Sequence, residues 1–429
     1  MNTAVIILLG SFLVMLFIRI PIAFSLGLST MITAFYLDLP PMVVMQQMVK
    51  GINSFSLMAI PFFIIAGEIM GQGGISDRLI KFSNVIIGWM RGGLAMVNIL
   101  ASMFFGGISG SSVADVSSIG AIMIPMMEKK GYDKDYSINV TITSSIQGII
   151  IPPSHNMIIY ALAAGGGISV AKLFLAGLVP GVLLGIALMI LSYAIAVKRK
   201  YPREEKVSLK EALKITRDSI LGLLTAVIII GGVTTGVFTA TESAAIAAVY
   251  AFIITFFVYR DIPIGKFVDI LRSSLSTLAM VVAIIATSSA FAWMMSYLQV
   301  PQMITDSLLH ISNNPIIIML IVNLILLFLG MIMDMAPLIV IATPILLPVV
   351  TSIGMNPITF GVVMMLNLGV GLLTPPVGST LFVGCSIGNA PIEDIAKSLM
   401  PFYAVLVIMV LILTFVPELT LWLPRFLMG

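Results

Sequence analysis

The segment GLLTPPVGSTLF, from Gly371 to Phe382, decides the fold class because its two adjacent prolines lie in a long stretch without charge. No Asp, Glu, Lys or Arg occurs between Met335 and Ile392. A helix of about 20 apolar residues crosses the hydrocarbon core of a bilayer, so this stretch must cross it more than once. The prolines are therefore expected at membrane depth.

The same composition extends over the whole chain. Further uncharged segments cover residues 173–197, 219–241, 273–305 and 398–417. Of the 429 residues, 59% are hydrophobic and 10% are charged, and the mean hydropathy is +1.14. These values predict an all-α polytopic membrane protein. The sequence contains no phosphate-binding loop, cofactor fingerprint or Cys/His metal cluster, so we expect no cofactor, no transition metal and no nucleic-acid partner.

Three landmarks recur with one spacing of 223 residues, which indicates an internal duplication. The pairs are Pro125 and Pro348, Gly131 and Gly354, and Pro152 and Pro375. Each copy is a Gly-interrupted apolar pair followed by a span with Pro-Pro in its middle. Duplications of this kind are typical of transporters.

The charged loops suggest that the two copies are inverted. Residues 198–218 contain eight Lys or Arg and four acids, which places this loop in the cytoplasm by the positive-inside rule. This loop could have a regulatory role, or it could be a plain solvated linker helix. The loop 128–135 carries three lysines, whereas its counterpart 352–357 is uncharged. Equivalent loops are therefore expected on opposite sides of the membrane.

The prolines predict two broken helices. Proline is tolerated in the first turn of a helix but disrupts its interior, so Pro152-Pro153 and Pro375-Pro376 should each end one half-helix and begin another. A kink used only for packing is the alternative. Freed carbonyls of the first half can face a cation, and the N-terminus of the second half can face an anion. The run GGISGSS (106–112) is expected to be the tip of a re-entrant helical hairpin.

Asp334 is the leading candidate for binding a cation. It is the only ionisable residue between His310 and Glu393, and it is equivalent to Ser111 in the first copy. A carboxylate in hydrocarbon indicates a functional partner, although a helix cap is the alternative. Hard cations prefer oxygen ligands, so we predict two cation sites, one per copy. Their candidates offer hydroxyl, carboxylate, amide or exposed carbonyl oxygens: Gly107, Ser109, Ser111, Ser112, Ile151, Gly330, Asp334, Asn367 and Thr374.

Polar residues that open the second half-helices are the candidates for binding an anion: Ser154, His155, Asn156, Ser379 and Thr380. No Lys or Arg lies near them, so helix ends, hydroxyls and amides would have to bind a carboxylate. His155 could instead be a structural histidine. The other intramembrane acids, Glu68, Asp115 and Glu242, are expected at helix ends or partner contacts rather than at proton sites.

Several segments in order carry a family resemblance: PFFIIAGEIM, GGLAMVNILASMFFGGISGSSVADVSSIGAIMIPMM, IIPPS, TATESAA and LTPPVGSTLFV. They resemble the large membrane (M) subunit of tripartite ATP-independent periplasmic (TRAP) transporters, over essentially the whole chain. Two positions depart from the family pattern. Ile149 lies where the family often has proline, and His155 lies where it usually has an apolar residue.

The resemblance implies a sodium-driven secondary importer of an organic anion, of the sialic acid or C4-dicarboxylate type, in the bacterial inner membrane. It also implies a small four-helix membrane (Q) subunit and a periplasmic substrate-binding protein as partners. Sodium is the implied coupling ion, with its sites at the hairpin tips and Pro-Pro breaks, including Asp334. The implied mechanism is an elevator-type movement of the hairpins and broken helices against a scaffold.

We accordingly expect five segments along the chain. Residues 1–91 are N-terminal scaffold helices, 92–172 the first transport repeat, 173–310 central scaffold helices with the basic loop, 311–397 the second transport repeat, and 398–429 a C-terminal scaffold helix. Each transport repeat should contain one hairpin and one broken helix.

Two other functions were compared with the importer. GISG (107–110) matches the short motif of intramembrane serine proteases, with Ser109 as nucleophile and His155 as base. That interpretation leaves the duplication, Asp334 and the second Pro-Pro unexplained, so we do not expect an enzyme. A passive anion channel is the third candidate, and it would lack coupling to an ion gradient.

Overall fold

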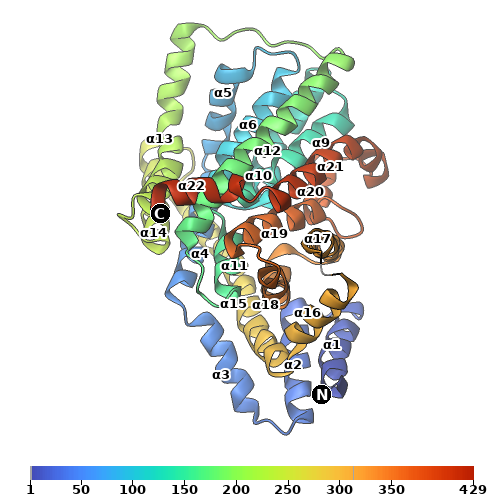
Figure 1. Cartoon of the computed structure of the whole chain (residues 1–429). Coiled ribbons are helices and arrows are strands. Elements are labelled where there is room, and N and C mark those ends of the chain that lie inside the picture. Colours follow the sequence, from blue (N-terminus) through green and yellow to red (C-terminus); the bar gives the residue numbers. More distant parts are fainter. Residues whose placement is uncertain (1, 313) are drawn as a thin grey trace.

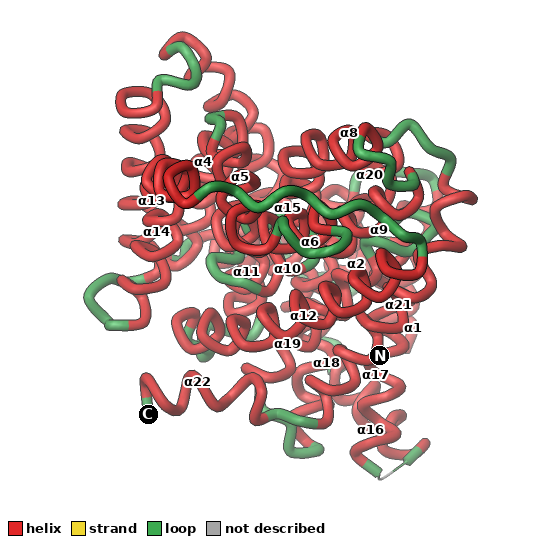
Figure 2. Tube along the Cα trace, turned by 90° about the horizontal axis from the view of Figure 1, so that it is seen from above, coloured by secondary structure: helices red, strands yellow, loops and turns green. Residues whose placement is uncertain are grey.

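The computed structural model describes residues 2–312 and 314–429, and these residues form helices joined by turns and loops, without a β-strand (Figures 1 and 2). The all-α prediction is confirmed. Six helical segments in the described residues are long and apolar enough to cross a membrane, and a bent pair can form a seventh. The chain is therefore a multi-pass membrane protein.

The membrane-length segments begin with α4 (Ala59–Gln72) and α5 (Ile75–Ile87), which meet at a bend of 71°. The six others are α12 (Val170–Lys198), α14 with its π-helical end (Ala240–Tyr259), α15 with its preceding turn (Ile264–Tyr297), α17 (Pro315–Ile332), α18 (Met335–Ser352) and α21 (Ile392–Phe415). The remaining long helix, α13 (Leu209–Thr234), packs against α5 and α14.

The first copy consists of a helical hairpin and an interrupted helix. Its hairpin is formed by α6 (Gly93–Ser109), a turn at Gly110 and Ser111, and the consecutive helices α7 (Ser112–Asp115), η2 (Val116–Gly120) and α8 (Ala121–Lys129). Its interrupted helix comprises α9 (Lys134–Ser144), α10 (Gln147–Ile150) and α11 (His155–Ala163). The tip falls within the Gly/Ser run singled out in the sequence.

The second copy has the same order of elements. Its hairpin is α17 and α18, joined at Met333 and Asp334. Its interrupted helix is α19 (Pro357–Gly371) followed by α20 (Ser379–Ile387). Both helices are thus broken around Pro-Pro, and both Pro-Pro peptide bonds are cis. The inverted relation of the copies stays a prediction.

Pairs of glycines bring each hairpin against its interrupted helix. A Cβ at Gly106 would lie 2.4 Å from the Cα of Gly148 in α10, and a Cβ at Gly371 would lie 2.6 Å from the Cα of Gly330 in α17. These approaches are too close for any side chain, so only glycine permits them. Gly148 and Gly371 are equivalent in the two copies, and in both the contact places the hairpin tip beside the break.

The N-terminal helices pack on α15, which in turn contacts α18 of the second copy. The N-terminal helices are α1 (Asn2–Phe17), α2 (Ile22–Tyr36) and α3 (Pro41–Ile52), and α15 packs against α2, α3, α4 and α18 (Figure 1). The short α16 (Val300–Ile311) covers α18. The C-terminal segment, expected as one helix, contains most of α21 and a separate α22 (Glu418–Met428), because Pro417 disfavours helical geometry at the residue before it.

Only residues 199–208 of the expected basic loop are outside helices, and they cross the base of the first hairpin as an extended segment (Figure 2), whereas residues 209–218 form the first turns of α13. Gly92 donates its backbone N–H to the carbonyl of Pro202 at 3.1 Å, and the Arg91 side chain donates to the carbonyl of Tyr201. Arg199 forms ion pairs with Asp133 and with Asp135, which lies in the first turn of α9. The start of this loop is therefore anchored to the loop that follows the hairpin.

Candidate functional site

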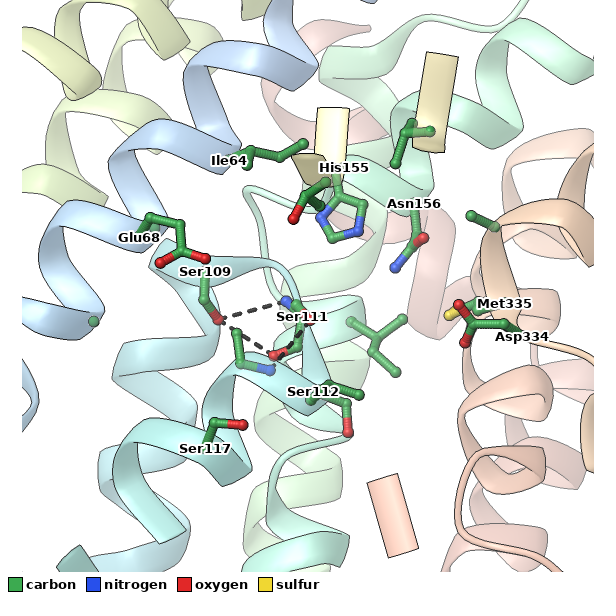
Figure 3. Close-up of a pocket in the computed structure, with 18 of the residues that line it drawn as sticks. Ile64, Glu68, Ser109, Ser111, Ser112, Ser117, His155, Asn156, Asp334 and Met335 are labelled. Carbon is green, nitrogen blue, oxygen red and sulfur yellow. Dashed lines mark hydrogen bonds between the residues drawn. The ribbon is translucent and has the colours of Figure 1, made fainter. Parts of the chain in front are cut away.

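A cavity of about 800 Å³ lies where both hairpin tips meet α4, α11 and α15 (Figure 3). Its polar lining comes from five helices or tips: Glu68, Gln72, Ser109, Ser111, Ser112, Ser117, Ser118, His155, Asn156, Thr277 and Asp334. Figure 3 shows Glu68 on one side and Asp334 on the other, with the first hairpin tip, His155 and Asn156 between them. Among the described residues, the lining contains two carboxylates and neither Lys nor Arg.

The first hairpin tip gathers oxygen atoms. The Ser109 hydroxyl lies 3.4 Å from both the backbone N–H and the carbonyl of Ser111, and the Ser111 hydroxyl accepts from the N–H of Ala114. A Cβ at Gly107 would lie 3.3 Å from the carbonyl oxygen of Pro152, the residue that follows Ile151. The structure thus brings the tip candidates close to the carbonyls of the first break. Hydroxyl and carbonyl oxygens of this kind are ligands that suit a hard cation.

The second hairpin tip is organised around Asp334. The carboxylate is exposed to the cavity at the start of α18, and among the described residues it makes no capping hydrogen bond, so a helix-cap role is not supported. The break lies alongside, because Val377 donates its N–H to the carbonyl of Met331 at 3.1 Å. The Thr374 hydroxyl donates to the carbonyl of Val370. Gly330 contacts Gly371 at the end of the first half-helix.

Asn367 lies one helical turn before Gly371 and is directed mainly toward α17. Its amide donates at 3.0 Å to both the side-chain and the backbone oxygen of Asn323. Its own carbonyl oxygen is buried and has no partner among the described residues. That oxygen is the part of Asn367 that could face a cation, although Asn367 does not line the cavity.

Two of the five anion candidates line the cavity, and the other three are not part of its lining. His155 and Asn156 open α11 and face the cavity. Ser154 is fully buried, and its hydroxyl and that of Ser379 have no partner among the described residues. Thr380 is also buried, where its hydroxyl is bonded to Ser112.

The contact between Ser109 and His155 that a serine protease would require is not formed among the described residues. In the described part of the chain, Ser109 makes its hydrogen bonds within the hairpin tip, and no hydrogen bond joins it to His155. A serine nucleophile requires a base within hydrogen-bond reach. The geometry therefore gives the serine protease interpretation no support.

Glu68 is the cavity residue whose role the sequence did not reveal. It accepts hydrogen bonds at 3.1 Å from Gln72 and from Ser273 of α15, 205 residues away. The sequence signal that could have indicated this role is the pair Glu68 and Gln72, two polar residues four positions apart in an otherwise apolar helix. Of the other acids, Glu242 is at a helix end as expected, in a capping box with Thr239. Asp115 is fully buried at the end of α7.

Comparisons with known proteins agree on one family. The family model described as "Tripartite ATP-independent periplasmic transporter, DctM component" matches residues 9–419. The chain is 43% identical to the uncharacterized protein YgiK of Salmonella typhimurium, covering 98% of this chain and 97% of YgiK. It is 38% identical to the sialic acid TRAP transporter large permease protein SiaM of Vibrio cholerae, with 90% of each covered. It is also 38% identical to the C4-dicarboxylate TRAP transporter large permease protein DctM of Vibrio cholerae, with 97% and 96% covered.

Solved structures share the fold at low sequence identity. The YdaH transporter of Alcanivorax borkumensis matches with a TM-score of 0.62 and 11% identity, covering 89% of this chain and 88% of YdaH. MtrF of Neisseria gonorrhoeae, from a class of antimetabolite efflux pumps, matches with a TM-score of 0.61 and 13% identity, covering 92% of this chain and 86% of MtrF. At such identities the similarity concerns the arrangement of helices alone.

Proposed function

The chain belongs to the family of DctM components, the large permease subunits of tripartite ATP-independent periplasmic transporters, and we propose that it is a sodium-coupled importer of an organic anion. The observation that carries this proposal is the cavity between the hairpin tips. Oxygen clusters at Ser109–Ser111 and at Asp334 border it, and helix N-termini open beside both.

The charge of the cavity gives a physical reason for coupling. Glu68 and Asp334 are the charged residues among its described lining, so the empty cavity repels a carboxylate. Two like charges about 8 Å apart repel by about 2 kcal/mol at an effective dielectric constant of 20. A sodium ion at Asp334 offsets that carboxylate's share of the repulsion, so the anion binds better after the cation. Such dependence couples the transport of the organic anion to the transport of sodium.

Sialic acid or a C4-dicarboxylate is the proposed substrate class. The similar proteins from Vibrio cholerae are named for these two substrates, and neither is excluded by a cavity of this size. The cavity recognises carboxylates with hydroxyls, amides and the N-terminus of α11 rather than with a basic side chain. No chemical step is proposed, and the protein acts as a carrier rather than an enzyme.

The proposal includes two partners: a small four-helix membrane subunit and a periplasmic substrate-binding protein. The family name supports a multi-component system. Large apolar side chains are exposed on α1 to α3, where lipid or a membrane partner would cover them: Phe17, Phe24, Phe35, Met42 and Met45. We also propose that the hairpins and interrupted helices move together against α15 as an elevator.

Uptake into proteoliposomes tests the proposal. The complex with its small subunit and binding protein is reconstituted, and labelled sialic acid and succinate are offered with and without an inward sodium gradient. Accumulation above equilibrium only with the gradient is the expected result. Equilibration that ignores sodium would instead indicate a passive channel, and sodium-independent accumulation would remove the assignment of Asp334 to a sodium site.

A further inference from the structure

A second cavity, of about 340 Å³, lies next to the first along the same helices. On α11, His155 lines the larger cavity and Ile159 the smaller one. On α15, the neighbours Ile284 and Ile285 line the larger and smaller cavity respectively. On α18, Val340 belongs to the smaller cavity. The two cavities are therefore consecutive along one interface between α15 and the interrupted helix.

The smaller cavity faces the side of the membrane away from the basic loop. It is lined by Gly165 and Gly166, which lie just before α12, whereas the basic loop follows the other end of that helix. The 29 residues of α12 separate the two ends by about 43 Å at 1.5 Å per residue. With the basic loop in the cytoplasm, this cavity opens toward the periplasm. Both glycines have positive φ and open space where a Cβ would be, so no neighbouring side chain packs against them at this end of the cavity.

The smaller cavity differs from the larger one in charge. Lys50 is the only charged residue in its described lining, and Gln47, Ser54 and Ser289 add hydrogen-bonding groups. Gln47 and Lys50 lie about one turn apart on α3, and Ser54 follows just beyond the end of that helix, so the three form a polar stripe along the cavity. A lysine with neutral hydrogen-bonding neighbours favours an anion, whereas the larger cavity favours a cation first.

Lys50 is held on the α15 side of the interface. A Cβ at its neighbour Gly51 would lie 2.1 Å from the hydroxyl oxygen of Ser289, so α3 and α15 are in direct contact here. Ile159, on the opposite wall, belongs to the interrupted helix. The polar stripe therefore lies on the α15 wall of the interface, opposite the interrupted helix.

We propose that the smaller cavity is an outer anion-receiving site, in which Lys50, Gln47 and Ser54 bind the carboxylate before it reaches the larger cavity. This inference rests on the proposed function, because it assigns the direction in which the organic anion passes. It adds a basic side chain to a route whose inner cavity has none among the described residues.

Thiol labelling tests the site without requiring transport. The chain has one cysteine, Cys385, so Cys385→Ala with Ser54→Cys leaves a single thiol in the cavity. Whole complexes in cells are treated from the periplasmic side with a sulfonate-bearing and a trimethylammonium-bearing methanethiosulfonate at low salt. The ratio of anionic to cationic labelling rates should fall at least fivefold with Lys50→Gln and remain unchanged with Lys172→Gln, a lysine at the start of α12 outside the cavity. An unreactive thiol or an equal ratio would overturn the proposal.

Transport kinetics provide the second measurement. With labelled sialic acid or succinate as the probe, Lys50→Gln should raise KM at least threefold with little change in kcat, and Lys50→Arg should restore KM. An unchanged KM in an active complex overturns the receiving site. If the wild type accumulates neither probe, the proposed function fails, whereas the labelling ratio still decides whether the cavity concentrates anions.

Discussion

The hydroxyls of Ser112 and Thr380 are hydrogen bonded at 3.0 Å although 268 residues separate them. Ser112 opens the helix after the first hairpin tip, and Thr380 lies in the first turn of the half-helix that follows the second break. Ser112 is also bonded to Ser145 at 2.6 Å, just before the first break. One hairpin tip therefore contacts both interrupted helices through buried hydrogen bonds, which is the geometry that a coupling between the two copies would require.

Thr380→Val should uncouple the two copies. Loss of this buried hydrogen bond costs about 1 kcal/mol of stability and leaves the shape of the side chain unchanged. Thr359→Val is the matched control, because Thr359 makes an equally buried bond of 2.8 Å with Thr420, away from the cavity. The melting temperature should fall by a similar amount in both variants. The sodium concentration for half-maximal uptake should rise only in Thr380→Val. An equal sodium response in both variants would contradict the coupling.

Asp334→Asn should remove most of the sodium dependence at little cost in stability. Among the described residues the carboxylate is exposed to the cavity and caps no helix, so replacing it removes a charge without breaking a contact. The half-saturating sodium concentration should rise more than tenfold in proteoliposome uptake, and the melting temperature should stay within error. A large fall in melting temperature would instead indicate that Asp334 is a structural acid.

Glu68→Gln is the matched change on the opposite wall of the cavity. Its hydrogen bonds to Ser273 and Gln72 explain its position without a bound cation, so sodium dependence should persist. Removing one negative charge from an anion route should lower KM about twofold to threefold, since screening limits the effect of a half-exposed group. A tenfold loss of sodium affinity in this variant would place the cation at Glu68 as well.

Local chemistry explains why some parts of the site could be predicted and others could not. Proline and glycine restrict the backbone wherever they occur, so the breaks at Pro152 and Pro375 and the tip near Gly110 could be read from the sequence. The solitary charge of Asp334 was equally visible. The contacts of Glu68 and Thr380 depend on how distant helices pack, which no local pattern encodes.

Asn367 is a candidate residue whose side-chain orientation could not be predicted from the sequence. Its residue type and position suggested a cation ligand, yet its amide is bonded to Asn323, which is itself bonded to Thr414 of α21 at 3.0 Å. The burial of Ser154 and Thr380 likewise follows from the packing of their helices rather than from their place at a helix N-terminus. Sequence reasoning identified segments that border the cavity, whereas the orientation of each side chain required the fold.

Asp115→Asn should preserve or raise stability. The carboxyl group is fully buried beside the Ser102 hydroxyl, and none of the described residues forms an ion pair with it. An ionised group in that environment is strongly unfavourable, whereas an amide of the same shape carries no charge to bury. The melting temperature of the purified complex should therefore be equal or higher. A fall of several degrees would show that the native carboxyl has a partner, such as a bound cation, that the amide cannot replace.

Arg199→Gln should release the start of the basic loop from the segment that joins the first hairpin to α9. Arg199 bridges Asp133 and Asp135, and the Tyr201 hydroxyl donates to Asp133 at 2.7 Å. Burial, followed by this hydrogen bond, raises the pKa of Tyr201 to about 12. A pKa raised by folding contributes stability that is fully present below the unfolded value of about 10 and is lost as the pH rises through the folded value.

Limited trypsin digestion between pH 7 and 9 measures this release within the range where Tyr201 stays protonated. Cleavage after Arg203 and Lys206 should accelerate at least fivefold in Arg199→Gln, because both residues lie in the extended segment that Arg199 anchors. Lys198→Gln is the control, since it removes a neighbouring positive charge that takes no part in the bonds to Asp133. Equal acceleration in both variants would show that net charge, rather than the ion pairs of Arg199, holds the loop in place.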